Sequence, residues 1–259
     1  MIFLIGGRGL VGSAFARLFD AQGVEYAILD RQNYAQYAGR SSKLVINANG
    51  NSRKPLARER PLEDFDASVR SVRASLTDFR FDRYIHLSSC DVYPDCGSPA
   101  STLESTPLAV HSQSPYGFHK YLAEQCVQHA AADWLIFRFG GFVGPGLKKN
   151  AIFDILKGGP LWLDPGSELQ FLRTDDAARI VMQIAGNVSR EIFNLCGNGV
   201  VRLSDVISFT GREVAVQPGS PLVRYDVSIT KISQHAAIPD SRESVLQFAR
   251  EQSQAGPAS

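Results

Sequence analysis

A glycine-rich turn between an apolar run and a helical pattern is the feature that most constrains the fold of this chain. Residues 1–5 predict a buried strand, and a segment with glycines at positions 6, 7, 9 and 12 follows it directly. Apolar residues then recur at helical spacing through Phe19, and residues 24–29 predict a second strand that closes on Asp30. This order of strand, glycine turn, helix, strand and acid is typical of a dinucleotide-binding unit.

The glycine turn predicts how a dinucleotide would bind. Glycines let the backbone approach a pyrophosphate, and the following helix N-terminus offers its amides and the positive end of its dipole. Asp30 can hydrogen-bond the adenosine ribose diol, which favours NAD, whereas Arg8 and Arg31 could grip a 2′-phosphate, which favours NADP. We expect NAD(P), with NAD preferred. The residues expected to contact it are Gly6, Arg8, Gly9, Leu10, Val11, Gly12, Asp30 and Arg31, with Asn47 and Ala48 at the end of the strand at 43–48 and Lys120 farther along.

A tyrosine and a lysine four residues apart predict a catalytic pair. Tyr116 and Lys120 lie one turn apart on one face of the helix predicted at 115–130, which Ser114 and Pro115 are well suited to start. A neighbouring ammonium favours the phenolate, so the pair can move a proton at a carbon–oxygen centre. Ser89 ends the strand predicted at 83–89 and could hold the reacting oxygen. Taken alone, this spacing is also common on solvated helix faces.

The composition is that of an ordinary soluble globular protein, with 44% hydrophobic and 20% charged residues. The formal net charge of +1 gives no electrostatic basis for binding nucleic acid, and no apolar run is long enough to cross a membrane. The four cysteines are scattered without zinc spacing, so we expect reduced thiols, no metal and a cytoplasmic protein. The basic run at residues 53–60 is more typical of a solvated loop than of a binding surface.

Taken together, the motifs resemble the extended short-chain dehydrogenases/reductases of the NAD-dependent epimerase/dehydratase type, many of which act on nucleotide sugars. They comprise the turn with glycines 6, 9 and 12, Asp30, Ser-Ser-x-x-Val-Tyr at 88–93, Ser-Pro-Tyr-Gly-x-x-Lys at 114–120, Arg138, Gly-Pro-Gly at 144–146, Thr-Asp-Asp-Ala at 174–177 and Phe-Asn-Leu at 193–195. The resemblance implies an α/β fold with a Rossmann-type doubly wound parallel sheet and a small C-terminal α/β substrate lobe. It also implies Ser89, Tyr116 and Lys120 as the catalytic residues, with Lys120 holding the nicotinamide ribose.

The sequence departs from the family pattern at three places that bear on the ligands. The helix–strand unit usual after Asp30 is missing, Gly141 stands where an asparagine is common, and Leu169 replaces a frequent diphosphate-binding arginine. Other cations near the predicted cleft could do that work, and we expect Lys148, Asn150 and Arg173 to hold a diphosphate. Asp91 lies where related dehydratases carry an assisting carboxylate and is a fourth candidate substrate residue, but we expect it to fix the loop by bonding backbone amides.

The chain predicts a dinucleotide-binding domain at residues 1–146, an interleaved substrate-binding lobe at 147–251 and a disordered tail at 252–259. The expected activity is that of an NAD(P)-dependent oxidoreductase, epimerase or dehydratase acting at a carbinol or ketone carbon, with a nucleotide sugar as the possible small-molecule substrate. The alternatives are a reductase of a small non-nucleotide ketone and a non-catalytic dinucleotide-binding sensor. In the family the helices at 62–79 and 115–130 form the usual dimer surface, so we expect a homodimer.

Overall fold

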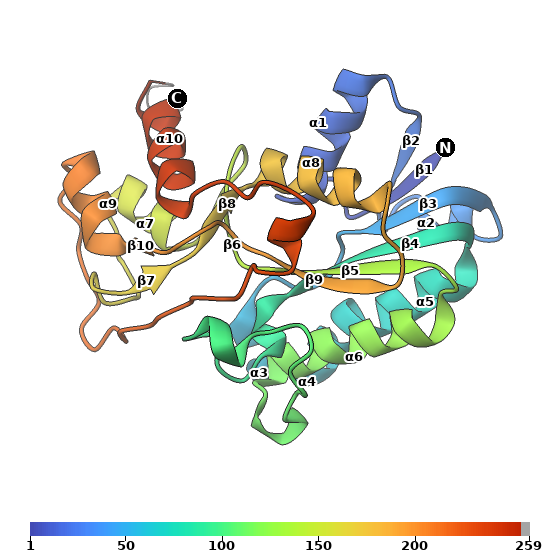
Figure 1. Cartoon of the computed structure of the whole chain (residues 1–259), viewed down its shortest axis with the longest axis horizontal. Coiled ribbons are helices and arrows are strands. Elements are labelled where there is room, and N and C mark those ends of the chain that lie inside the picture. The colour runs from blue at the N-terminus through green and yellow to red at the C-terminus, as the bar shows by residue number, and fades with distance from the viewer. Residues whose placement is uncertain (255–259) are drawn as a thin grey trace.

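Six parallel strands form the central sheet of the computed structural model, which describes residues 1–254. They lie in the order β2-β1-β3-β4-β5-β9, with every neighbouring pair parallel (Figure 1). Their apolar residues point to both faces of the sheet, as expected for strands buried on two sides. The strands are β1 (Ile2–Ile5), β2 (Tyr26–Leu29), β3 (Ser41–Asn47), β4 (Arg80–Ser89), β5 (Trp134–Phe139) and β9 (Glu191–Leu195).

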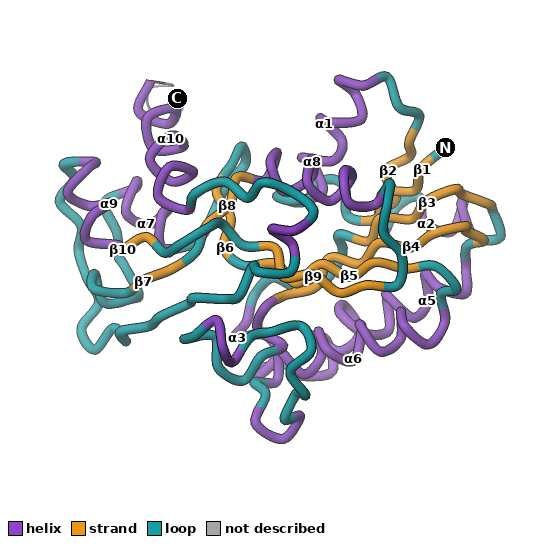
Figure 2. Tube along the Cα trace, in the orientation of Figure 1, coloured by secondary structure: helices purple, strands orange, loops and turns teal. Residues whose placement is uncertain are grey.

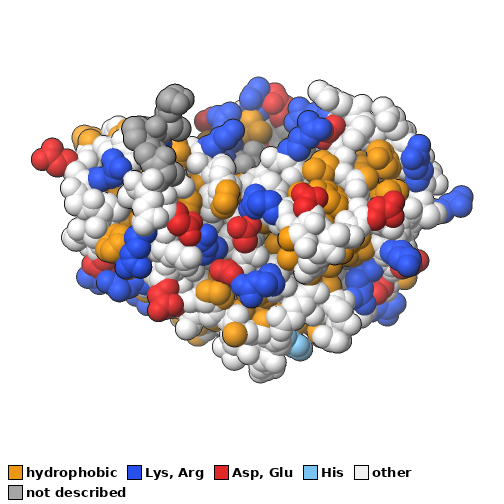
Figure 3. Space-filling model, turned by 90° about the horizontal axis from the view of Figure 1, so that it is seen from above, with side chains coloured by type: hydrophobic (Ala, Val, Ile, Leu, Met, Phe, Trp, Pro, Cys, Tyr) orange, Lys and Arg blue, Asp and Glu red, His pale blue; other side chains and the backbone are white. Residues whose placement is uncertain are grey.

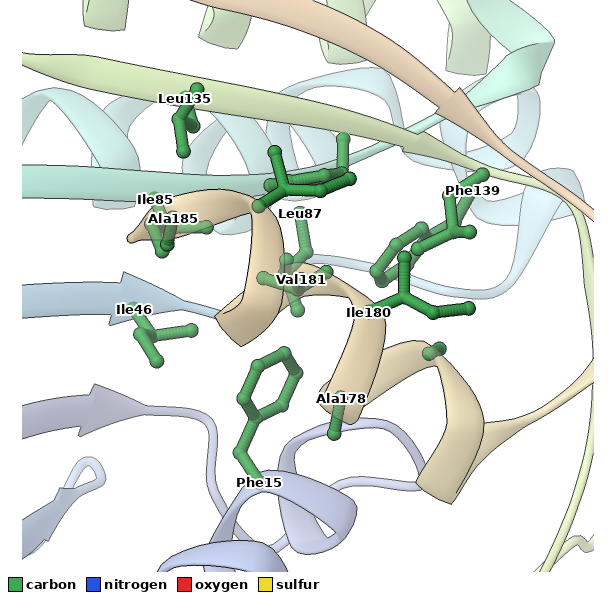
Figure 4. Packing of buried hydrophobic residues seen from close by; sticks show 14 of the residues in the cluster. Phe15, Ile46, Ile85, Leu87, Leu135, Phe139, Ala178, Ile180, Val181 and Ala185 are labelled. Atoms are coloured by element: carbon green, nitrogen blue, oxygen red, sulfur yellow. The ribbon is translucent and has the colours of Figure 1, made fainter. Parts of the chain in front are cut away.

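Helices cover both faces of this sheet. Helices α1 (Gly12–Gln22) and α8 (Thr174–Ala185) pack on one face, and α5 (Ser71–Asp78) and α6 (Pro115–Ala130) pack on the other (Figure 1). Figure 4 shows the first of these interfaces, where side chains of α1 and α8 meet apolar residues of β3, β4 and β5. The predicted α/β class and the doubly wound parallel sheet are therefore confirmed.

The glycine turn between β1 and α1 is as tight as the sequence predicts. The Gly9 N–H donates to the Gly6 carbonyl at 3.0 Å, and Gly6 has a φ of +77°. A Cβ at position 12 would overlap the Gly6 carbonyl oxygen. The first turn of α1 can therefore lie directly on the turn only because residue 12 has no side chain.

A second hydrophobic cluster lies at the end of the molecule away from β2. It is formed by side chains such as Ile152, Phe171, Leu203 and Val245, and Figure 2 shows its helices α7, α9 and α10 gathered there. Strand β6 pairs with β8 in parallel, and β7 pairs with β10 antiparallel. The elements are β6 (Gly141–Val143), α7 (Ala151–Lys157), β7 (Glu168–Leu169), β8 (Phe171–Arg173), β10 (Val201–Arg202), α9 (Leu203–Thr210) and α10 (Ser241–Gln254).

Two elements of the region predicted as the small lobe belong instead to the main layers. Helix α8 contributes Ile180 and Val181 to the core against the central sheet, and β9 pairs with β5 as the sixth strand. The apolar side chains of β9, Phe193 and Leu195, are fully buried there. The chain thus leaves the sheet after β5 and returns to it before it enters α9.

The remaining elements lie between β2 and β4. The short helix α2 (Tyr34–Tyr37) is the only one between β2 and β3, so β2 is an edge strand, as the missing helix–strand unit predicts. Before β4 come α3 (Lys54–Glu59), α4 (Pro61–Phe65) and a π-helical turn (Asp66–Arg70) that leads into α5. The segment predicted as one helix at 62–79 is therefore α4, the π-helical turn and α5 in succession.

The expectation for the chain end is modified. Helix α10 continues to Gln254, so the first three residues of the predicted disordered tail are helical, while residues 255–259 lie outside the described part.

Within residues 1–254 no helix combines the length and apolarity that crossing a membrane requires. On the face that carries α1, α8 and α10, Lys and Arg alternate with Asp and Glu (Figure 3), as where Arg17 of α1 pairs with Asp175 of α8 at 2.5 Å.

Candidate active site

Helix α6 is held at its first turn by two local contacts. The Ser114 Oγ accepts the Gly117 N–H at 3.1 Å, and Pro115 fills the first helical position, where no N–H is needed. A Cβ at position 117 would overlap the Asp91 carbonyl oxygen, so glycine is what lets α6 pack against the turn that follows β4. This packing brings Tyr116 and Ser89 to the wall of the same cavity.

The cavity has a volume of about 810 Å³ and lies at the carboxyl end of the central sheet, where parallel sheets place their ligands. Its wall includes Leu10 from the glycine turn, Ser89 and Tyr116, and Phe139 at the end of β5. The C-terminal part of the chain completes it with Leu147, residues 149–151 and 161–163, and Val223, Tyr225 and Val227. The cavity therefore joins the predicted dinucleotide turn, the predicted catalytic residues Ser89 and Tyr116 and the C-terminal part of the chain, whereas Lys120 is not part of its wall.

Lys120 lies one turn after Tyr116, with its Nζ 5.5 Å from the centre of the tyrosine ring. The side chain is buried, and burial lowers the pKa of Lys120 to about 8, against the carboxylates of Asp64, Asp91 and Glu124, which act in the opposite direction. A lysine with this pKa is still mostly charged at neutral pH, and it can gain or lose a proton at a pH close to neutral. The predicted spacing of the pair is thus realised on one helix face.

The pKa of Tyr116 is raised well above its ordinary value, contrary to the expectation that the lysine would favour the phenolate. Burial is the largest cause, and the carboxylates of Asp91 and Asp64 add to it, while Lys54 and Ser89 act in the opposite direction. The sequence could not show that two carboxylates lie near the ring. Tyr116 is therefore protonated at neutral pH.

The acid predicted to contact the adenosine ribose lies at the end of the edge strand β2. One Asp30 oxygen accepts the Gln32 N–H at 2.9 Å, and the other lies 3.3 Å from Nε of Arg8. The Arg8 side chain is 72% exposed, and Arg31 is exposed as well. Arg8 and Asp30, which were expected to compete over the choice of cofactor, therefore form an exposed ion pair with each other.

Asn47 and Ala48 support the glycine turn from behind. The Asn47 side chain is buried, where its amide donates to the Tyr84 hydroxyl at 2.6 Å and its oxygen accepts the Asn49 N–H at 2.9 Å. A Cβ at Gly6 would lie 2.9 Å from the Ala48 carbonyl group. The polar groups of the Asn47 side chain therefore form their hydrogen bonds inside the protein, and Ala48 contacts the glycine turn through its backbone.

A model of the NAD dependent epimerase/dehydratase family matches residues 2–196, which is most of the chain and includes every part of the dinucleotide turn and the Ser89, Tyr116 and Lys120 set. The chain belongs to this family. The resemblance inferred from the motifs is thereby confirmed.

Solved structures share the fold of this family member at low sequence identity. MoeE5 in complex with UDP-glucuronic acid and NAD has a TM-score of 0.79 and 18% identity, over 97% of this chain and 99% of that one. A UDP-galactose 4-epimerase has a TM-score of 0.79 and 20% identity, over 98% and 99%. RMD from Pseudomonas aeruginosa complexed with NADPH has a TM-score of 0.75 and 16% identity, over 96% and 99%. A search among curated proteins found no match.

Two family motifs meet in a buried polar network beneath the cavity. Arg138 on β5 pairs with Glu124 of α6 at 2.7 Å, with side chains only 3% and 0% exposed. The same guanidinium donates to the Tyr93 hydroxyl at 2.9 Å, and that hydroxyl donates to Asn194 on β9 at 2.9 Å. The Asn194 amide donates in turn to the Thr102 carbonyl at 2.6 Å. The network therefore ties the loop after β4 to α6 and to two strands of the sheet.

The Asp91 carboxylate binds side chains and not the backbone amides that we expected. Its Oδ2 accepts the Ser89 hydroxyl at 2.9 Å, and its Oδ1 accepts Lys54 Nζ at 2.7 Å and the Tyr225 hydroxyl at 3.0 Å. Asp91 and Tyr225 together raise the pKa of Lys54, although burial acts the other way. Lys54 was expected to lie on a solvated loop, and Tyr225 carried no sequence signal at all. Both line the cavity beside Ser89 and Tyr116.

The four residues predicted to hold the substrate are not brought together. Asp91 and Asn150 line the cavity, but Asn150 caps α7 by accepting the Phe153 N–H at 2.9 Å. Arg173 pairs with Glu251 of α10 at 2.9 Å, and neither Arg173 nor Lys148 forms part of the cavity wall. Lys149 lies there in place of its neighbour, with Nζ bonded to the Ser52 carbonyl at 2.8 Å.

Proposed function

We propose that this chain is an NAD(P)-dependent oxidoreductase of the epimerase/dehydratase family that acts at a carbinol or ketone carbon, with Ser89, Tyr116 and Lys120 as its catalytic residues. The observation that carries the proposal is their convergence: Ser89 and Tyr116 line one cavity together with Leu10 of the glycine turn. Lys120 lies behind the tyrosine ring on the same helix face. A dinucleotide-binding sensor without turnover would need none of these three side chains.

The glycine turn fits a dinucleotide because backbone atoms fill the space that a Cβ would occupy at positions 6 and 12. When bound, the dinucleotide supplies or accepts the hydride. The protein then supplies placement and proton transfer. Tyr116 delivers the proton to the carbonyl oxygen during reduction, or takes it from the hydroxyl during oxidation, and Ser89 orients that oxygen. Lys120, largely charged at neutral pH, would hold the nicotinamide ribose and stabilise the tyrosine after it has lost its proton.

We expect NAD(H) to bind more tightly than NADP(H). Asp30 directly follows β2, where the family pattern expects the acid that binds the ribose diol, and a 2′-phosphate would meet its carboxylate. Arg8 is already paired with Asp30, so it has to leave that pair before it can grip a phosphate. Titration of the protein with both reduced cofactors measures this preference. Tighter binding of NADPH would mean that Arg8 dominates the site.

For the substrate we favour a nucleoside-diphosphate sugar. The cavity of about 810 Å³ is large enough for such a ligand, and Arg53 and Lys149 supply positive charge on its wall. These cations take the place of the predicted Lys148 and Arg173. A small non-nucleotide ketone is the second candidate, and the specific observation in its favour is the apolar stretch of wall formed by Leu147, Leu163 and Leu169.

The experiment combines a catalytic variant with a substrate panel. Purified protein with NAD(H) or NADP(H) is incubated with UDP-, GDP- and dTDP-sugars and with small ketones, and cofactor absorbance and product formation are followed. Tyr116→Phe should lower turnover by roughly 10²–10⁴-fold and leave cofactor affinity nearly unchanged. Tyr121→Phe is the matched control, because Tyr121 lies on the same helix but outside the cavity wall. Near-normal turnover in Tyr116→Phe would exclude the catalytic assignment.

A further inference from the structure

Lys54 joins three parts of the chain that are distant in sequence. It stands at the start of α3, its Nζ donates to Asp91 Oδ1 at 2.7 Å and to the Tyr225 hydroxyl at 3.2 Å, and it lies 5.1 Å from the centre of the Tyr225 ring. Asp91 in turn accepts the hydroxyl proton of Ser89. A single cation is therefore two hydrogen bonds away from the catalytic serine.

The ammonium group remains within reach of a ligand. Although Lys54 is paired, 56% of its side-chain surface is accessible, and the side chain forms part of the cavity wall. An ammonium has three N–H donors, and Asp91 and Tyr225 account for two of them. Among the described residues no protein acceptor is left for the third N–H, which leaves it for a solute in the cavity.

The surroundings of Lys54 favour a ligand with negative charge. Arg53 is adjacent in sequence and close enough to Lys149 to lower the pKa of that lysine, together with burial, which is the larger cause. Lys149 donates to two oxygens of Ser52, which are uncharged. Among the described residues, Asp91 is the one carboxylate recorded in an ion pair with any of these three cations. The cavity wall carries the three cations Arg53, Lys54 and Lys149 against the two carboxylates Asp91 and Asp154, so one positive charge is in excess.

We propose that Lys54 is the specificity-determining cation of the cavity and binds a phosphate group of the substrate, with Asp91 as the counter-ion that the phosphate partly displaces. The proposal rests on the function proposed above and names the residue that selects its substrate. The phosphate is recognised from the side of the central sheet, by Lys54 at the start of α3, and not from Arg173 on β8. Binding of the phosphate also weakens the ion pair between Lys54 and Asp91. Because the other oxygen of Asp91 accepts the Ser89 hydroxyl, substrate binding then changes the environment of Ser89.

The test measures binding by calorimetry with NADH present at saturation. The probes are inorganic pyrophosphate, UDP, uridine and malonate, applied to the wild type and to Lys54→Gln, Asp91→Asn, the double variant and Arg58→Gln. Arg58 is the matched control, because it removes the same charge from the same helix outside the cavity wall. The exposed Trp162 lies on the cavity wall and offers fluorescence quenching as an independent readout.

The expected result has a signature that a merely structural role would not produce. Lys54→Gln should weaken pyrophosphate and UDP by about tenfold, since a charge-assisted hydrogen bond is lost. Asp91→Asn should instead tighten both by a few-fold, because the competing carboxylate is gone. The double variant should bind like Lys54→Gln, and Arg58→Gln like the wild type. Uridine should be insensitive to all four changes.

Four results would overturn the proposal. Equal affinities in Lys54→Gln and Arg58→Gln would show that Lys54 makes no contact, and weaker binding in Asp91→Asn would show that the carboxylate does not compete. Binding of malonate in preference to pyrophosphate would exclude phosphate as the recognised group. Absence of any phosphate binding while NADH binds normally would also refute the role of Lys54, yet leave the proposed oxidoreductase function standing. A failure of NADH to bind refutes that function separately.

Discussion

Replacing Lys120 by methionine should make the folded protein more stable while it weakens cofactor binding. Lys120 is 6% exposed and its pKa is lowered to about 8, with burial as the main cause. Methionine has a similar length and brings no charge into this position. The substitution therefore removes the cost of burying an ammonium and keeps most of the packing.

The magnitude follows from the pKa of the folded and unfolded states. In the unfolded chain the lysine keeps an ordinary pKa of about 10.4, whereas in the folded protein it is about 8. Between these two values the unfolded state binds more protons, so the stability of the wild type rises with pH across this window. Below pH 8 the full cost is present, and at about 1.4 kcal/mol per pKa unit it amounts to roughly 3 kcal/mol.

Urea unfolding followed by circular dichroism at several pH values between 6.5 and 10.5 measures this effect. Lys120→Met should exceed the wild type by roughly 3 kcal/mol at pH 7, and the difference should shrink as pH rises through the window. Lys43→Met is the control, because Lys43 is exposed on β3, and it should lie within about 0.5 kcal/mol of the wild type. A pH-independent difference, or a less stable Lys120→Met, would refute the reasoning. The same variant should bind NADH at least about tenfold more weakly if Lys120 contacts the cofactor.

Three further predictions concern stability and association. Arg138→Met should destabilise the protein by about 3–5 kcal/mol, because it leaves the buried Glu124 carboxylate without its partner, and exposed Arg70→Met should change urea midpoints little. Gly117→Ala should cost about 1–3 kcal/mol through the clash with the Asp91 carbonyl, whereas Gly186→Ala, with an ordinary helical φ of −72°, should raise Tm slightly or leave it unchanged. Leu62 is 79% exposed on α4, so Leu62→Glu should convert the expected homodimer into a monomer in light scattering; a monomeric wild type would contradict the dimer itself.

The sequence was sufficient for most of the fold because its signals are local. The glycine turn, the helix start at Ser114 and Pro115 and the apolar strands each depend on residues close together in the chain. The apolar residues of α5 and α6 give less support to a homodimer, since Val72, Leu76 and Val127 pack in the intramolecular core and not on the surface. The strand expected in the small lobe at 192–195 pairs with β5 in the central sheet, because a short apolar strand does not reveal which sheet it joins.

The site was predictable only where one element carried the pattern. Tyr116 and Lys120 share a helix, and their pairing follows from their spacing. Lys54 meets Asp91 across 37 positions and Tyr225 meets it across 134, so these contacts depend on the tertiary path of the chain. The partner of Arg173 was not predictable for the same reason, since Glu251 lies 78 positions away on α10.

The position of β9 also bears on how the protein is made. A chain synthesised from its N-terminus completes β5 well before β9, yet β9 is the strand that covers the outer edge of β5. Until residue 195 and helix α8 are available, the nascent sheet has an open edge and an uncovered apolar face. Chain segments that end near residue 146 would keep both, and we expect them to aggregate or to recruit chaperones during expression. The smallest fragment worth producing as a dinucleotide-binding unit therefore extends past Leu195.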